Sequence, residues 1–97
     1  MTANNSRAKN FNVTVRGIKL SIPKDVLDDI DMVELLGEVQ DGDVFAFPKL
    51  AKLMFGEDGF KRVKEGLSGE DGRTKVTDVV ELFTEALNAC NALAAKN

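Results

Sequence analysis

The chain has 97 residues, a formal net charge of -3 and 43% apolar residues, with no His, Tyr or Trp and one Cys. These values are typical of one small globular domain, and the missing side chains exclude most arrangements for nucleophilic catalysis and transition-metal binding. We therefore expect no enzyme, no cofactor and no metal site, and also no membrane span, because no run approaches the ~18 apolar residues that a span needs.

The charge is divided along the chain. Residues 1–24 carry five bases and no acid, whereas residues 25–97 carry 8 bases and 16 acids. Because the acidic body repels phosphates, we do not expect nucleic-acid binding. Two interpretations of the division stay open: the halves attract each other within one fold, or the basic segment meets an acidic partner.

The first element is a polar segment, residues 1–10, which we expect to be a flexible arm. Residues 11–97 are expected to form one globular domain, since a chain of this length buries enough apolar surface for a single core. No signal-peptide pattern is visible, and one unpaired Cys is typical of a reducing compartment. We therefore expect the protein in the cytoplasm.

Apolar and polar residues then alternate on both sides of Arg16-Gly17, which predicts two strands joined by a two-residue turn. The turn sets a register that pairs Val15 with Ile18, Val13 with Leu20 and Phe11 with Ile22. All six side chains lie on one face, so the register and the hydrophobic pattern agree. Because an isolated hairpin is marginal in water, this face is expected to pack on helices.

Helical repeats fill the rest of the chain. They run from about Val26 to Val39, from about Ala46 to Phe55, from about Asp58 to Leu67, and from a cap at Thr77 or Asp78 to the C-terminus. The Gly-rich acidic turns between them lack the ligand spacing of a calcium loop. The predicted fold class is therefore α+β and mainly α, with the N-terminal β-hairpin packed on a small bundle of about four helices.

The last helix is apolar over roughly half of its circumference, which is more than one core-facing side requires. One stripe, expected to face the core, consists of Val76, Val80, Phe83, Leu87, Cys90 and Ala94, with Val79 beside it. The neighbouring stripe consists of Leu82, Ala86, Ala89 and Leu93. Its cover is either another helix of the domain or a partner protein. We assign this second stripe as a candidate partner-binding surface, together with Phe45 and Phe47 beside Pro48.

The second half of the chain also contains a familiar order of short segments. They are Phe47-Pro48-Lys49-Leu50-Ala51-Lys52-Leu53-Met54-Phe55-Gly56-Glu57, Gly59-Phe60-Lys61-Arg62-Val63, Asp71-Gly72-Arg73-Thr74-Lys75-Val76, and Glu81-Leu82-Phe83 in the closing helix. Over about residues 18–95 this order resembles the short form of the tail assembly chaperones of long-tailed phages, especially those of Gram-positive hosts.

The resemblance implies a chaperone that acts in the host cytoplasm and is absent from the finished virion. It would bind the long helical tape measure protein and help to recruit tail tube subunits. It also implies a longer form made by a programmed ribosomal frameshift, for which the codons of Ala95-Lys96-Asn97 could hold the slippery sequence. Self-association stays open. The alternative function is an acidic regulatory or inhibitory module that occupies the basic surface of another protein.

Overall fold

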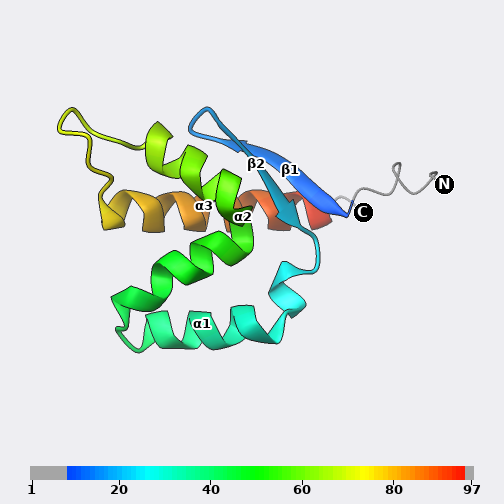
Figure 1. Ribbon diagram of the computed structural model, residues 1–97. Helices are drawn as coiled ribbons and strands as arrows, with labels where there is room; N and C mark the ends of the chain where they lie inside the picture. Colours follow the sequence, from blue (N-terminus) through cyan, green and yellow to red (C-terminus); the bar gives the residue numbers. More distant parts are fainter. Residues whose placement is uncertain (1–8, 96–97) are drawn as a thin grey trace.

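The computed structural model describes residues 9–95, which form an N-terminal two-stranded antiparallel hairpin and a set of helices behind it (Figure 1). In chain order the elements are β1 (Asn10–Val15), β2 (Ile18–Pro23), the 3-10 helix η2 (Val26–Asp28), α1 (Ile30–Gln40), the 3-10 helix η3 (Val44–Ala46), α2 (Phe47–Gly66) and α3 (Val76–Ala95). The fold is mainly helical with an N-terminal hairpin, as predicted, but it has three α-helices in the described range rather than about four.

The arm predicted over residues 1–10 falls almost entirely outside the described residues, which begin at Lys9. Regular structure starts one residue earlier than predicted, because Asn10 already belongs to β1. The amide of Lys24 donates a hydrogen bond to the carbonyl oxygen of Lys9 at 2.8 Å, which extends the pairing past the start of β1. Lys96 and Asn97, where the frameshift is expected, also lie outside the described residues.

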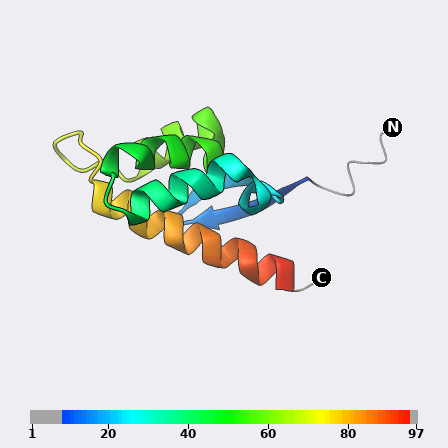
Figure 2. The same cartoon turned by 90° about the horizontal axis from the view of Figure 1, so that it is seen from below.

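The hairpin has the predicted register. Its partners include Val15 with Ile18, Val13 with Leu20 and Phe11 with Ile22. The turn residues Arg16 and Gly17 have φ values of 54° and 79°. Positive φ at both central positions is the type I′ geometry, whose twist matches the twist of the strands. The apolar face of the hairpin lies on the helices, with β2 against α2 and β1 against α3 (Figures 1 and 2).

Arg16 also ties the turn to α3. Its Nη2 lies 2.6 Å from Oε2 of Glu85 and 3.2 Å from Oε1 of Glu81, and its Nε donates to Glu85 Oε1 at 3.0 Å. These hydrogen bonds lower the pKa of Glu85 and raise the pKa of Arg16. The contact is exposed, so its main effect is to orient the hairpin on α3. At this point the basic N-terminal segment does meet acids of the same fold.

The first predicted helix is divided at Asp29. Residues Val26–Asp28 form η2, and α1 begins at Ile30 because the Asp29 carboxylate accepts a hydrogen bond from the Asp31 amide at 2.9 Å. This is an N-cap, which satisfies a helical N–H that has no partner within the helix. The repeat expected from about Val26 to Val39 is therefore interrupted at this N-cap.

The two short helices predicted on either side of Gly56 are one kinked element, α2. Gly56 has φ 77° and ψ 165°, a conformation that is essentially restricted to glycine. The helical path changes direction there, and the second limb follows without an intervening loop (Figure 1). The predicted stop at Gly56 is therefore right. Two helical limbs meet there without a loop between them and count as one element, which accounts for the difference in helix count.

The core lies between the hairpin, α2 and α3. Fully buried residues come from each helix and include Met32, Leu50, Met54, Val63 and Leu82. The Phe83 ring makes edge-to-face contacts with the rings of Phe47 and Phe55, at centroid distances of 5.6 and 6.2 Å. Edge-to-face pairs of this kind stabilise a core beyond the area that they bury.

Helix α3 is rotated relative to the predicted orientation. Val76 and Val80, which were expected to face the core, are 59% and 40% exposed. The buried side of α3 consists of Val79, Leu82, Phe83, Ala86 and Cys90, so Phe83 and Cys90 face the core as predicted and are joined there by Leu82 and Ala86. The buried side of α3 is wide because two elements, the hairpin and α2, pack against this helix.

Candidate functional site

The expected partner-binding strip on α3 is not a surface. Leu82 and Ala86 have no exposed area, and Phe47 is only 6% exposed. We therefore correct the assignment of these three residues: they cannot contact a partner while the domain is folded, because all three belong to the buried core. Ala89 and Leu93 are half-buried against the same core, and they keep only a small accessible area.

Phe45 is the candidate that the structure leaves accessible, at 84% exposed. It lies in η3. Asp43 caps this helix, and its carboxylate accepts a hydrogen bond from the Phe45 amide at 3.0 Å. This cap fixes the backbone, and the chain then turns so that Phe47 enters the core while Phe45 faces solvent. Two phenylalanines separated by one residue thus have opposite environments.

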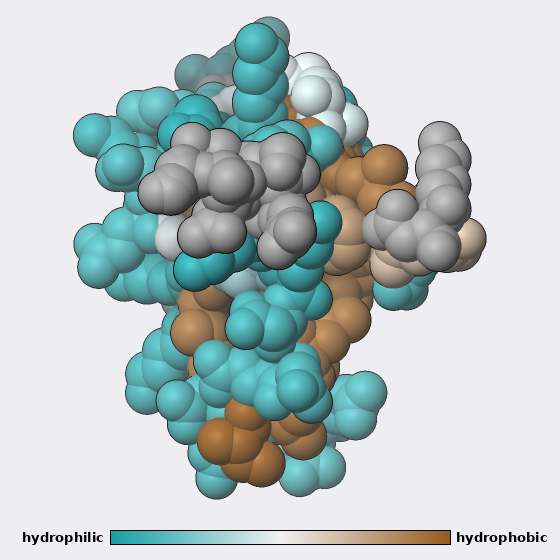
Figure 3. All heavy atoms as spheres, turned by 90° about the vertical axis from the view of Figure 1, so that its right-hand side faces the viewer, coloured by the Kyte–Doolittle hydropathy of each residue, from teal (hydrophilic) through white to brown (hydrophobic). Residues whose placement is uncertain are grey.

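Other large apolar side chains are also exposed, and most lie around α1. The exposed set is Leu27, Ile30, Val33, Val44, Phe45, Val76 and Val80. Ile30 is 70% exposed, and Figure 3 shows hydrophobic side chains gathered at the lower end of one face, where α1 begins. This surface was not predicted from the sequence, although a signal was present: the apolar residues of α1 extend around the helix beyond the side on which Met32 is buried.

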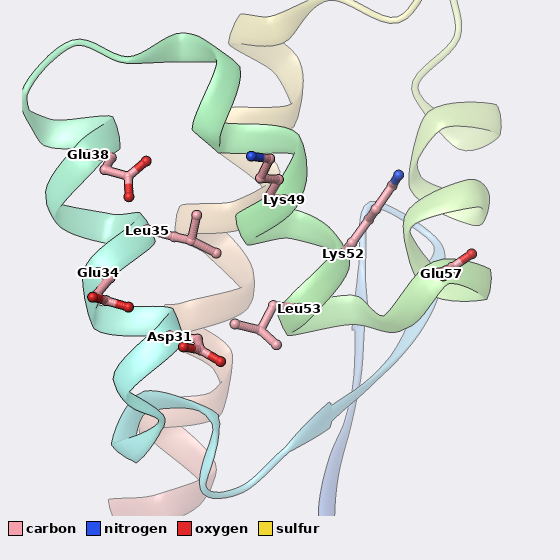
Figure 4. Close-up of a pocket in the computed structure, with 8 residues that line it drawn as sticks. All are labelled: Asp31, Glu34, Leu35, Glu38, Lys49, Lys52, Leu53 and Glu57. Atoms are coloured by element: carbon pink, nitrogen blue, oxygen red, sulfur yellow. The ribbon is translucent and has the colours of Figure 1, made fainter.

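A groove of about 550 Å³ runs between α1 and the first limb of α2 (Figure 4). The two helices are joined only by a short turn and η3, so they return alongside each other. The floor of the groove contains Leu35 from α1 and Leu53 from α2, both half-buried, and Figure 4 shows them pointing toward each other. Apolar side chains therefore remain accessible at the bottom of an open channel.

The two rims of the groove carry opposite charges. Asp31, Glu34 and Glu38 line the α1 side, and Lys49 and Lys52 line the α2 side. Residues spaced by three or four positions share one helix face, so each rim presents its charges along the groove. No ion pair within 4.0 Å joins the rims; in the described part of the chain, the pairs within that distance are those of Arg16. Glu57, near the Gly56 kink, is a further acid at the α2 side.

The negative charge of the protein is concentrated on one segment. Residues 25–43, here called the acidic segment, carry eight acids and no base. These acids are Asp25, Asp28, Asp29, Asp31, Glu34, Glu38, Asp41 and Asp43. Residues 44–97 carry eight acids and eight bases. The excess of acids over bases in residues 25–97 therefore lies entirely in the acidic segment, which contains η2, α1 and the turn after α1. Such a field attracts basic groups.

Reactive side chains are not gathered at this groove or elsewhere in the described range. Within residues 9–95, no group of three or more His, Cys, Asp or Glu side chains is placed to hold a metal ion. Cys90 is buried in the core, and desolvation raises the pKa of its thiol, which makes the nucleophilic thiolate scarce. The groove has features of a binding site, because its apolar floor is accessible to solvent and its two rims carry separated charges.

The chain matches no protein-family model, and comparisons with curated proteins and with solved structures also give no match. Across the helices of residues 9–95, none has both the length and the apolar content needed to cross a membrane.

Proposed function

We propose that this protein is a tail assembly chaperone of a long-tailed phage, which binds apolar helices of the tape measure protein in the host cytoplasm and is not retained in the virion. The observation that carries the proposal is the exposed apolar surface around α1 and η3, where Ile30 and Phe45 are 70% and 84% exposed. The order of short segments that resembles these chaperones supplies the identity of the partner.

The physical role follows from the properties of the tape measure helix and of the exposed apolar residues of this domain. A tape measure helix is apolar and tends to aggregate until the tail tube encloses it. A small domain with scattered exposed apolar residues covers such a helix through weak contacts, and several copies along one helix add avidity. Weak individual contacts also allow release when tail tube subunits replace the chaperone. No bond-making chemistry is needed, and we propose no enzymatic activity.

Co-expression with the tape measure protein encoded in the same genome tests the function. We expect the wild-type chain to keep the tape measure protein in the soluble fraction and to co-purify with it. Ile30→Asp and Phe45→Asp should each reduce co-purification at least tenfold, because a charge then enters the apolar contact. Asn88→Asp is the matched control, since it adds the same charge at an exposed position on α3.

Two outcomes would contradict the proposal. If the wild-type chain neither solubilises nor co-purifies with the tape measure protein, the function is wrong. If binding is normal but both aspartate variants retain it, with far-ultraviolet circular dichroism showing folded protein, then the surface is wrong. The frameshifted longer form has its own test, because the coding DNA must contain a slippery run near the codons of residues 95–97.

A second function is favoured by a specific observation, the eight acids and no base of residues 25–43. An acidic module could occupy the basic surface of another protein and inhibit it. Such binding would be dominated by charge, so it should fall steeply as salt rises, whereas apolar helix binding should not. Binding to the tape measure protein that persists at about 1 M salt, where the Debye length is about 3 Å, favours the chaperone.

A further inference from the structure

We propose that the groove between α1 and α2 binds a helix of another protein in one direction only, and that this helix has an apolar stripe with basic residues along one flank and acidic residues along the other. The inference rests on the proposed function in that the protein must dock a helix; the groove lies beside the exposed apolar surface that contains Ile30 and Phe45 and is lined by different residues. It goes further by giving the chemistry of that helix and its orientation.

The unlike rims carry the inference. The α1 rim has three carboxylates, and the α2 rim has two ammonium groups on its first limb with one acid, Glu57, past the Gly56 kink; Leu35 and Leu53 lie between the rims (Figure 4). A helix that places its apolar stripe on the two leucines must present one flank to each rim. Basic residues are favoured opposite α1 and acidic residues opposite Lys49 and Lys52, because like charges at these positions repel.

The shape of the groove sets the length of the contact. From Asp31 to Glu38 the α1 rim rises about 10 Å along its axis, which corresponds to about two turns of a helix. The floor contributes two half-buried leucines, so the guest needs apolar residues at spacings of three or four to meet them. Such a small floor gives modest affinity, and the charged rims therefore have a large share in deciding how the helix lies.

The direction of binding follows from symmetry. Turning an amphipathic helix end over end, with its apolar stripe kept on the floor, exchanges the flanks that face the two rims. A guest with unlike flanks therefore matches the rims in one direction and opposes them in the other. If the two rims carried the same charge, both directions would be equivalent. The charges on the two rims thus select the direction in which the partner helix binds.

Among residues 9–95, a second copy of this chain offers no such helix. Within their described spans, α1 and α3 contain no Lys or Arg, so neither has a basic flank. Helix α2 has basic residues, but its apolar residues, including Leu50, Met54 and Val63, are buried in the core. The occupant is therefore a segment of a different protein.

A spin-labelled peptide measures the direction. The probe is a helical peptide of about 18 residues with a leucine stripe, lysines on one flank and glutamates on the other, and a nitroxide at its N-terminus. Bound to isotope-labelled protein, it should broaden amide signals at one end of the groove, either near Asp31 or near Glu38. A second peptide with the flanks exchanged should broaden the opposite end. A third, with glutamates on both flanks, should bind at least tenfold more weakly.

Exchanging the rims provides the matched variant. The variant Glu34→Lys, Glu38→Lys, Lys49→Glu and Lys52→Glu keeps the net charge of the protein, so any effect is due to placement. It should reverse the end that the first peptide broadens. The preference should also disappear for wild-type protein at about 1 M salt, where the Debye length is about 3 Å. If the rim variant does not fold, the exchanged-flank peptide on wild-type protein still decides the direction.

The proposal is overturned if the first two peptides broaden both ends equally, if they broaden the same end, or if signals of Leu35 and Leu53 do not shift on binding. These results are distinct from failure of the proposed function. A chain that binds the tape measure protein but shows no directional peptide binding keeps its function and loses this inference. Directional peptide binding without tape measure binding gives the reverse conclusion.

Discussion

Replacement of Leu82 by Ala should remove a large part of the stability of this domain. Leu82 has no exposed area and lies on the side of α3 that the core encloses. Truncating a fully buried leucine costs the transfer free energy of the lost atoms and leaves a cavity, together about 3 kcal/mol. A domain of this size has a total stability of about 5–15 kcal/mol, so the variant should still fold at room temperature.

Thermal and urea unfolding, followed by circular dichroism at 222 nm, measure this cost. A loss of about 3 kcal/mol should lower the melting temperature by about 15 °C in a chain of about 100 residues. Phe45→Ala is the control, because its side chain is 84% exposed, and it should change the unfolding free energy by less than about 0.5 kcal/mol. A loss below about 1 kcal/mol for Leu82→Ala, or equal losses for the two variants, would refute the placement of Leu82 in the core.

Three further substitutions test the structure: two glycine replacements should have opposite effects on stability, and Arg16→Asn should have an effect that depends on pH. Gly56→Ala should lower the unfolding free energy by about 1–3 kcal/mol, since alanine is strained at φ 77° and ψ 165°. Gly37 lies in the interior of α1, and no atom lies within 4 Å of an added Cβ. Gly37→Ala should therefore raise the unfolding free energy by up to about 1 kcal/mol in the same urea titration. Arg16→Asn keeps a residue that tolerates the positive φ of the turn but removes the hydrogen bonds to Glu85, whose pKa is lowered in the folded protein. That stabilisation is present above the unfolded-state pKa of Glu85 and is lost as pH falls through its folded-state value. The urea midpoints of wild type and Arg16→Asn should therefore differ at neutral pH and converge in acid, and a difference that is constant with pH would contradict the ion pair.

Local patterns were sufficient for the hairpin. Its alternation, a two-residue turn and one apolar face admit a single register, and a shift by one residue would move every apolar side chain to solvent. The stop at Gly56 was also visible, because glycine interrupts a helical repeat. What the repeat did not show is that the chain continues directly into the second limb of α2, which made two expected helices into one.

The exposed apolar surface was predicted on α3, and the structure places it elsewhere for a physical reason. The sequence shows that α3 has more apolar circumference than one neighbour can cover, but it does not show how many neighbours there are. The hairpin and α2 together cover it, so Leu82 and Ala86 are core residues. The exposed apolar residues are those around α1, which lies at the margin of the fold and contacts mainly η2, η3 and α2.

The sequence by itself determined the fold class, the hairpin register, the thin supply of reactive groups and the acidic balance, since each depends on residue identity or on neighbours along the chain. Only the tertiary structure decided which apolar faces are covered, and it alone brought the carboxylates of α1 opposite Lys49 and Lys52. Burial and charge pairing depend on elements that meet in space, and the same apolar stripe becomes core or docking surface according to what packs on it.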